Sequence, residues 1–242
     1  MIPARYAASR FPAKLMQLLG DKTVIRHTYD NTVATNLFDE VIVVTDSDII
    51  YNEIINNGGS AIMSIATHES GSDRIAEALV NMPAPAGTEG DVDIVINVQG
   101  DEPFVQKESL KKLLNVFTDE TVQVASLMQV LKEDKFIRDP NYVKVAVDKN
   151  MNALFFSRSP IPYHRDKTGN PLYYEHIGVY AFRKQALINF TNWEVTPLEA
   201  VEKIECLRYL ENGIPIKMVV TEYMGIEIDT PEDLVRAAKL IG

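Results

Sequence analysis

Short runs of aliphatic and β-branched residues alternate with amphipathic stretches through the first half of this 242-residue chain. Strands are predicted at residues 40–45, 61–65 and 93–98, since continuous apolar runs are typical of strands buried in a parallel sheet. Between them, polar caps and helical spacing of apolar residues predict helices, such as the one at 23–35. This order of strands and helices predicts an α/β fold with a doubly wound sheet.

The pattern changes after about residue 131, where shorter alternating segments replace the continuous apolar runs. Alternation of apolar and polar positions is typical of half-buried antiparallel strands. We therefore expect an antiparallel excursion over about 131–182, inserted in a single domain that spans residues 1–242.

Capping residues predict where the helices in the last part of the chain begin. Thr196 and Glu199 have the spacing of a capping box, which predicts one helix that continues to about residue 211. A strand is predicted at 216–221, and Thr230 is the expected cap of the last helix.

Composition limits the classes of partner. The formal net charge is −10, with 24 Lys and Arg against 34 Asp and Glu. Nucleic-acid binding needs a basic face, so this balance argues against it, although a local group of cations can still bind a small anion. Cys206 is the one cysteine of the sequence, so a reducing, cytoplasmic location is expected. No apolar run reaches about 20 residues, the length that a membrane helix needs.

Three cations, Arg5, Arg10 and Lys14, lie on a proline-containing loop directly after the first short apolar segment. Loops that leave the carboxyl ends of strands bind ligands in α/β folds. Guanidinium groups on such a loop suit phosphate oxygens, which they bind in pairs. The loop is thus a candidate polyphosphate site. The alternative is a solvated basic loop, which spacing alone favours because exposed Arg and Lys are common.

Two acidic motifs are candidates for metal binding. Asp101 directly follows the predicted strand at 93–98, and Mg²⁺ takes carboxylate oxygens together with phosphate oxygens. Taken alone, the Gly-Asp-Glu-Pro sequence around Asp101 is also typical of a turn. Asp46 and Asp48 form a D-x-D motif, a pattern that binds the metal ion in many glycosyltransferases. Here it lies at a predicted helix start, where capping is the favoured interpretation.

Five groups of motifs, in the same order along the chain, resemble those of the sugar nucleotidyltransferase family, in particular its 3-deoxy-manno-octulosonate (Kdo) cytidylyltransferases. They are R-Y-A-A-S-R-F-P-A-K at 5–14, S-G-S-D-R at 70–74, N-V-Q-G-D-E-P at 97–103, F-F-S-R-S-P-I-P at 155–162 with H-I-G-V-Y at 176–180, and I-D-T-P-E-D-L at 228–234. The resemblance implies a Rossmann-like, doubly wound mixed sheet of the nucleotide-diphospho-sugar transferase type, with the antiparallel excursion used for sugar binding and dimerisation.

The resemblance also implies the residues of each subsite. The implied nucleotide-binding residues are Ala4, Arg5, Arg10, Lys14, Ser70, Gly71, Arg74 and Gln99. The implied catalytic residues are Arg10, Lys14 and Asp101, and the implied Mg²⁺ ligands are Asp101 and Asp229. Residues expected to contact the sugar acid are Arg158, Arg165, His176, Tyr180 and Glu205. The sequence departs from the family pattern at the residue after Glu205, where relatives commonly have Gln and this chain has Cys206.

The activity implied by the resemblance is transfer of CMP from CTP to the anomeric hydroxyl of Kdo, giving CMP-Kdo and pyrophosphate for lipopolysaccharide biosynthesis. The expected enzyme is a Mg²⁺-dependent homodimer. A different acceptor, such as sialic acid, is one alternative, because sugar pockets vary more than nucleotide loops. A catalytically silent nucleotide-binding module is another, although the presence of Arg10, Lys14, Asp101 and Asp229 argues against it. A D-x-D glycosyltransferase would use a nucleotide-sugar donor instead of free CTP.

Overall fold

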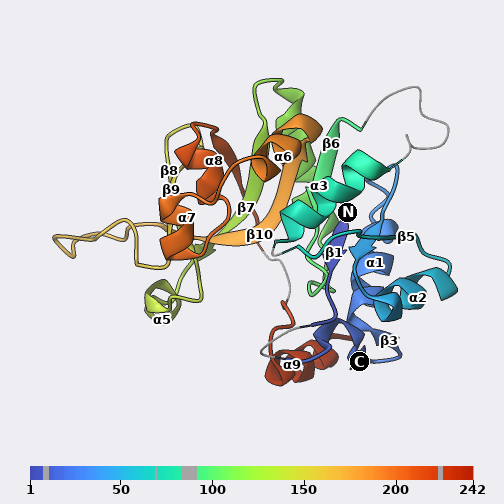
Figure 1. The fold of residues 1–242 in the computed structure, drawn as a ribbon. Coiled ribbons are helices and arrows are strands. Elements are labelled where there is room, and N and C mark those ends of the chain that lie inside the picture. The colour runs from blue at the N-terminus through green and yellow to red at the C-terminus, as the bar shows by residue number, and fades with distance from the viewer. Residues whose placement is uncertain (8–10, 69, 83–91, 223–225, 242) are drawn as a thin grey trace. The chain divides into compact units, whose positions relative to one another are not determined.

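The computed structural model describes residues 1–7, 11–68, 70–82, 92–222 and 226–241. The chain forms two compact units, the first made of residues 1–110 and 224–242 and the second of residues 111–223. Each unit combines strands with helices, which agrees with the predicted α/β class (Figure 1).

The first unit is built on short parallel strands. β1 (Ile2–Ala4) pairs with β4 (Val43–Thr45), and β4 pairs with β5 (Ala61–Met63). β1 and β4 are buried along their whole length, as their uninterrupted apolar sequences predict. The end of β6 (Ile94–Asn97) reaches the start of β1, because Val98 N donates a hydrogen bond of 3.0 Å to the Met1 carbonyl. The predicted strands are therefore present, with shorter bounds.

Helices connect these strands, and side-chain caps begin several of them. α1 (Val24–Ala34) begins after Thr23, whose hydroxyl accepts a hydrogen bond from Arg26 N. The remaining elements of this unit are α2 (Asp48–Asn56), α3 (Gly71–Asn81), α9 (Pro231–Ile241), the 3-10 helix η1 (Lys14–Met16) and the hairpin of β2 (Leu18–Leu19) and β3 (Lys22–Thr23). α4 (Lys107–Asn115) crosses the boundary between the units in sequence.

The second unit contains a mixed sheet whose strands follow the order β11-β7-β10-β8-β9. β11 and β7 are parallel, and the other neighbours in this order are antiparallel, as predicted for the excursion. The strands are β7 (Val124–Leu131), β8 (Lys144–Val147), β9 (Ala153–Ser157), β10 (Tyr173–Arg183) and β11 (Ile216–Val220). The helices are η2 (Val116–Thr118), α5 (Asp134–Arg138), α6 (Lys184–Thr191), α7 (Pro197–Glu202) and α8 (Leu207–Glu211).

The single helix predicted from Thr196 to about residue 211 is wrong, because the structure divides it into α7 and α8. The predicted capping box of Thr196 and Glu199 is present at the start of α7. Lys203 then adopts a left-handed conformation with φ of 54°, which ends the helix. Across this break, Arg208 Nη2 lies 2.6 Å from Glu199 Oε1, and both side chains are buried. A buried ion pair therefore joins the two short helices.

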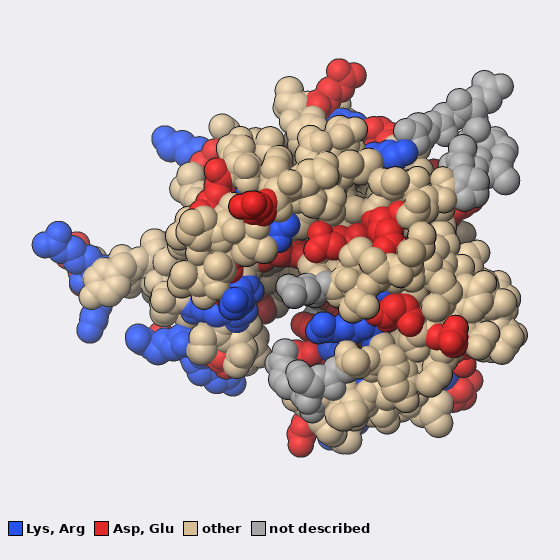
Figure 2. All heavy atoms as spheres, in the orientation of Figure 1, with Lys and Arg blue, Asp and Glu red and all other residues tan. Residues whose placement is uncertain are grey.

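Charged side chains of both signs are interspersed on the face drawn in Figure 2. On that face, Lys and Arg form several separate groups and not one continuous basic surface. Among the described helices, none combines the length and the apolar character that crossing a membrane requires.

Candidate functional site

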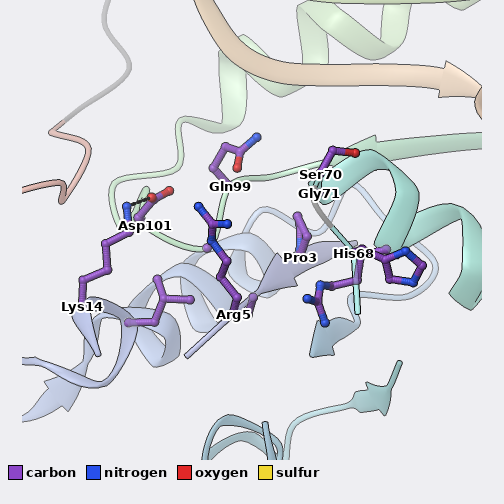
Figure 3. Close-up of a pocket in the computed structure, with 12 residues that line it drawn as sticks. Pro3, Arg5, Lys14, His68, Ser70, Gly71, Gln99 and Asp101 are labelled. Atoms are coloured by element: carbon purple, nitrogen blue, oxygen red, sulfur yellow. Dashed lines mark hydrogen bonds and ion pairs between the residues drawn. The ribbon is translucent and has the colours of Figure 1, made fainter. Parts of the chain in front are cut away.

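A cavity of about 160 Å³ lies in the first unit, at the ends of its strands (Figure 3). The segments that follow β1, β5 and β6 form its walls, together with the start of α3, as expected for a ligand site in an α/β fold. Its lining residues are Pro3, Ala4, Arg5, Lys14, Leu15, His68, Ser70, Gly71, Arg74, Gln99, Gly100 and Asp101. They include every described residue that was predicted to bind the nucleotide. Arg10, also predicted to act there, lies outside the described residues.

Two glycines in the wall allow the loops to approach the end of β1. A Cβ atom on Gly100 would lie 3.1 Å from the Pro3 carbonyl oxygen, and one on Gly71 would lie 3.0 Å from Pro3 Cγ. Both separations are tighter than most side chains tolerate. The glycines thus keep backbone groups close to the cavity, where a ligand can contact them.

One end of the cavity carries a group of opposite charges. Lys14 Nζ forms an ion pair with Asp101 and lies 2.7 Å from Asp229 Oδ1. Burial alone would lower the pKa of Lys14, but the charges and hydrogen bonds of Asp101 and Asp229 outweigh it and raise this pKa above its ordinary value. Lys14 is therefore a fixed cation between the two residues predicted to hold a metal ion.

A third carboxylate joins this group. Oxygen atoms of Asp101, Glu227 and Asp229 all lie within 4.8 Å of one another. The hydrogen bond of 2.9 Å from Ile228 N to the Asp101 carbonyl brings the two segments together. The sequence analysis missed Glu227, although its alternation with Asp229 in Ile-Glu-Ile-Asp was a usable signal, because alternate residues of an extended segment share a face. Three carboxylates suit a hard cation such as Mg²⁺, which prefers oxygen ligands.

The D-x-D motif has a different role from the one predicted. Ser47 occupies the cap position of α2 but makes no side-chain capping hydrogen bond. Asp46 Oδ2 instead accepts a hydrogen bond of 2.8 Å from Arg74 Nη2, and Arg74 Nη1 donates to Ser64 Oγ at 2.7 Å. Because Arg74 is 3% exposed and lines the cavity, the function of Asp46 is to hold a buried cation at the cavity wall. The motif therefore lies at the start of α2 as predicted, with Ser47 at the cap position, but no side chain caps the helix and Asp46 binds Arg74 instead.

The opposite end of the cavity contains His68, which the sequence analysis did not single out. His68 Nε2 lies 2.7 Å from Glu77 Oε2. Glu77 also accepts hydrogen bonds from Ile65 N at 2.6 Å and Ala66 N at 2.9 Å. Burial alone would raise the pKa of Glu77, but these hydrogen bonds outweigh it and lower the pKa. Glu77 thus anchors both the loop and the imidazole.

In the second unit, several residues predicted to contact the sugar lie together. The His176 and Tyr180 ring centroids are 5.3 Å apart, and His176 Nε2 lies 3.1 Å from Ser126 Oγ. Burial lowers the pKa of His176 to about 4, so the ring is neutral near pH 7. Burial raises the pKa of Tyr180, which shares a hydrogen bond with Cys206, and the charge of Glu205 raises it further. This region of the second unit therefore combines two neutral side chains, His176 and Tyr180, with the negative charge of Glu205.

The two arginines predicted to hold the sugar carboxylate have different surroundings. Arg158 donates hydrogen bonds from all three of its guanidinium nitrogens to backbone carbonyls: Nε to Glu202 at 2.7 Å, Nη1 to Pro140 at 2.9 Å and Nη2 to Lys203 at 3.3 Å. Arg165 is exposed on the segment between β9 and β10. Arg158 is thus held by local backbone in this structure, whereas Arg165 is accessible.

Comparison with known proteins gives consistent matches over the full chain. Residues 1–219 match a protein family described as Cytidylyltransferase. The chain is 57% identical to a 3-deoxy-manno-octulosonate cytidylyltransferase of Flavobacterium johnsoniae, over 100% of this chain and 97% of that protein. It is 43% identical to the protein of the same name from Thermodesulfovibrio yellowstonii, over 100% of this chain and 96% of that protein.

Solved structures give the same result. A CMP:2-keto-3-deoxy-manno-octonic acid synthetase complexed with CTP matches with a TM-score of 0.90 and 35% identity, over 99% of this chain and 96% of that chain. A 4-diphosphocytidyl-2C-methyl-D-erythritol synthase from Anaerococcus prevotii matches with a TM-score of 0.63 over 99% of this chain and 96% of that chain. At 19% identity, this second likeness concerns the fold alone.

Proposed function

The chain belongs to the cytidylyltransferase family, and on that premise we propose that it transfers CMP from CTP to the anomeric hydroxyl of Kdo, with release of pyrophosphate. The observation that carries the proposal is the cavity of the first unit, in which Arg5, Lys14 and Asp101 lie beside the glycine-containing loops. A nucleoside triphosphate needs cations for its phosphates and close backbone groups for its base and sugar, and this cavity supplies both.

In this reaction the chain's own residues act mainly by position and charge. The hydroxyl oxygen of the sugar loses its proton to solvent and forms a bond to the α-phosphorus of CTP. The bond from that phosphorus to the oxygen shared with the β-phosphorus breaks, and pyrophosphate leaves with the electron pair. Lys14 and Arg5 offset the negative charge of the triphosphate, which otherwise repels an incoming sugar acid. In this mechanism Lys14 exchanges its carboxylate partners for phosphate oxygens when the nucleotide binds.

A divalent cation fits the carboxylates at this end of the cavity. Asp101 and Asp229 are the residues that would hold Mg²⁺, and Glu227 adds a third carboxylate within the same 4.8 Å. When bound, Mg²⁺ offsets phosphate charge and aligns the phosphate oxygens for displacement. Asp101 and Asp229 also pair with the ammonium of Lys14, so the same two carboxylates would position both the metal ion and this side chain.

For the acceptor, the second unit offers chemistry that suits a polyhydroxylated acid. His176 and Tyr180 are neutral groups with hydrogen-bonding atoms for hydroxyls, and the exposed Arg165 is available to a carboxylate. Arg158 would first have to give up a contact with backbone, so we assign it to shaping this region. We propose that sugar recognition rests on His176, Tyr180, Glu205 and Arg165.

We also propose a homodimer that uses the excursion at 131–182. What supports this proposal is the exposed apolar surface of the segment, where Leu154, Tyr163 and Leu172 are 63%, 84% and 61% exposed and are available for a partner to bury. Light scattering after size exclusion tests this proposal. A mass close to twice 27.2 kDa is expected, and a monomer at micromolar concentration contradicts it.

The experiment for the proposed activity measures pyrophosphate release from CTP and Mg²⁺ with Kdo, with sialic acid or with no acceptor. Release with Kdo alone is the expected result. Release with sialic acid alone would keep the reaction but contradict the acceptor. No release with any acceptor, from folded protein that binds CTP, would favour a silent nucleotide-binding module.

A further inference from the structure

The two ends of the cavity differ in chemistry. Lys14 and Asp101 lie at one end in Figure 3, whereas His68, Ser70 and Gly71 lie at the other, with Arg5 and Gln99 between them. A nucleoside triphosphate has the same polarity, with phosphates at one end and the base at the other. If the charged end takes the phosphates, as the proposed function requires, the base lies at the end of His68.

Most polar side chains at this end already have partners. The Ser70 hydroxyl donates to Asp73 Oδ2 at 2.7 Å and accepts from Asp73 N at 3.1 Å. Arg74 donates to Asp46 and Ser64. These groups build the wall, and their hydrogen-bonding capacity toward a base is reduced.

His68 differs from these residues because its anchor leaves one ring nitrogen available. Glu77 is ionised and can only accept, so His68 Nε2, 2.7 Å away, must donate to it. In the neutral ring, Nδ1 then carries the lone pair and is an acceptor. Within the described part of the chain, Nδ1 has no hydrogen-bond partner.

From this arrangement we propose that His68, oriented by Glu77, determines specificity for cytosine by accepting a hydrogen bond from its exocyclic amino group. This inference rests on the proposed function and specifies how its nucleotide is chosen. Cytosine presents an amino donor at the position where uracil presents a carbonyl acceptor. An acceptor at His68 Nδ1 therefore favours CTP. With UTP, Nδ1 and the uracil carbonyl are both acceptors, so no hydrogen bond forms between them. Glu77 is the positioning residue, because its carboxylate selects the tautomer that leaves Nδ1 free.

The anchor is well suited to this role. Glu77 lies on α3 and its carboxylate is bound by two backbone N–H groups as well as by His68, so neither the loop nor the ring can turn without breaking these contacts. Rigid placement matters because a specificity contact loses its discrimination when the group can rotate to offer a donor instead.

The experiment compares the dissociation constants of CTP and UTP by calorimetry for the wild-type chain, His68→Ala and Glu77→Gln. His68→Ala should lower the preference for CTP over UTP by about 10- to 100-fold, the effect of one hydrogen bond replaced by an unmatched polar group. Glu77→Gln should lower the preference less, because the amide can still accept from Nε2 but can also donate and select the other tautomer. His27→Ala is the matched control, since His27 contacts the Leu19 carbonyl and does not line the cavity.

A purely structural role predicts a different pattern. If His68 only supported the loop, both nucleotides would lose affinity by the same factor in His68→Ala and the preference would stay unchanged, which would overturn the inference. Wild-type turnover of CTP with Kdo is measured in parallel. Turnover with an unchanged preference in His68→Ala contradicts this inference alone, whereas no use of CTP by the wild-type chain contradicts the proposed function.

Discussion

Lys14 Nζ lies 2.7 Å from Asp229 Oδ1, although 215 positions separate the two residues in the chain. The same ammonium binds Asp101, so one cation holds two carboxylates that would otherwise repel each other. This contact connects the first loop of the chain to the segment that precedes the last helix, and it places all three residues at the charged end of the cavity.

Replacing Lys14 by Met should destabilise the protein through these carboxylates. Asp101 and Asp229 would lose their shared cation, with an expected loss of about 1–3 kcal/mol in the free energy of unfolding. Added Mg²⁺ should raise the thermal midpoint of Lys14→Met more than that of the wild-type chain, because the vacant carboxylates can bind the ion. An identical Mg²⁺ response in both proteins would contradict the role of Lys14 as an internal counter-ion.

Substitutions of the carboxylates should have graded effects on metal use. Asp101→Asn is expected to reduce turnover by at least about 100-fold while leaving the thermal midpoint nearly unchanged. Glu227→Gln should lower the apparent affinity for Mg²⁺ by about 10-fold, measured as the Mg²⁺ dependence of turnover, with a smaller effect at saturating Mg²⁺. Glu232→Gln, an exposed position in the first turn of α9, is the control. Full activity of Asp101→Asn at saturating Mg²⁺ would exclude its assigned role.

The two acidic residues of the D-x-D motif should behave differently. Asp46→Asn weakens the anchor of Arg74 in the cavity wall, so the affinity for CTP should fall by about 5- to 10-fold. Asp48→Asn is the matched control, because Asp48 is exposed in the first turn of α2, and it should change CTP affinity less than about twofold. Equal losses in both variants, together with a change in Mg²⁺ dependence, would support a metal site at the motif instead.

The ion pair between α7 and α8 should be important for the stability of the second unit. Arg208→Met leaves Glu199 as a buried, unpaired charge, with an expected loss of about 3–5 kcal/mol in the free energy of unfolding. The double variant Glu199→Leu with Arg208→Met removes both charges and should be much more stable than the single variant. Urea unfolding of both proteins measures the difference, and equal stability of the two would show that the charge of Glu199 is not responsible.

His176 should make stability depend on pH below neutrality. Its pKa is about 4 in the folded chain and 6.5 ordinarily, so the unfolded state binds the proton more readily between these values. The stability linked to His176 is therefore complete above pH 6.5 and is lost as the pH falls toward 4, by at most about 3 kcal/mol because the residue as a whole is only partly buried.

His176→Gln should flatten this part of the curve of unfolding free energy against pH. His164→Gln is the control, since His164 contacts only the Thr168 carbonyl among the partners described for it. Parallel curves for His176→Gln and the wild-type chain between pH 4 and 6.5 would rule out His176 as the source of the dependence.

The amino-acid sequence by itself determined the strands of the first unit and the loops that carry the chemistry. Buried strands need uninterrupted apolar residues, and the polar residues that directly follow such a run must emerge at the carboxyl end of the strand. For this reason Lys14 and Asp101 could be placed at one edge of the sheet before their positions were known, whereas Ser70 and Gln99 were assigned to the site by motif resemblance alone. Motif resemblance then specified a nucleotide as the ligand.

The tertiary structure alone decided which charges pair. Asp46 had the local pattern of a helix cap, yet its carboxylate binds Arg74, because a buried guanidinium competes more strongly for it than exposed backbone N–H groups do. Lys203 carries no sequence signal for a left-handed turn, but its conformation lets Arg208 reach Glu199. Glu227 and Glu77 likewise acquire their roles from segments distant in the chain. Local sequence specifies backbone elements, whereas long-range pairing depends on distances that only the folded chain sets.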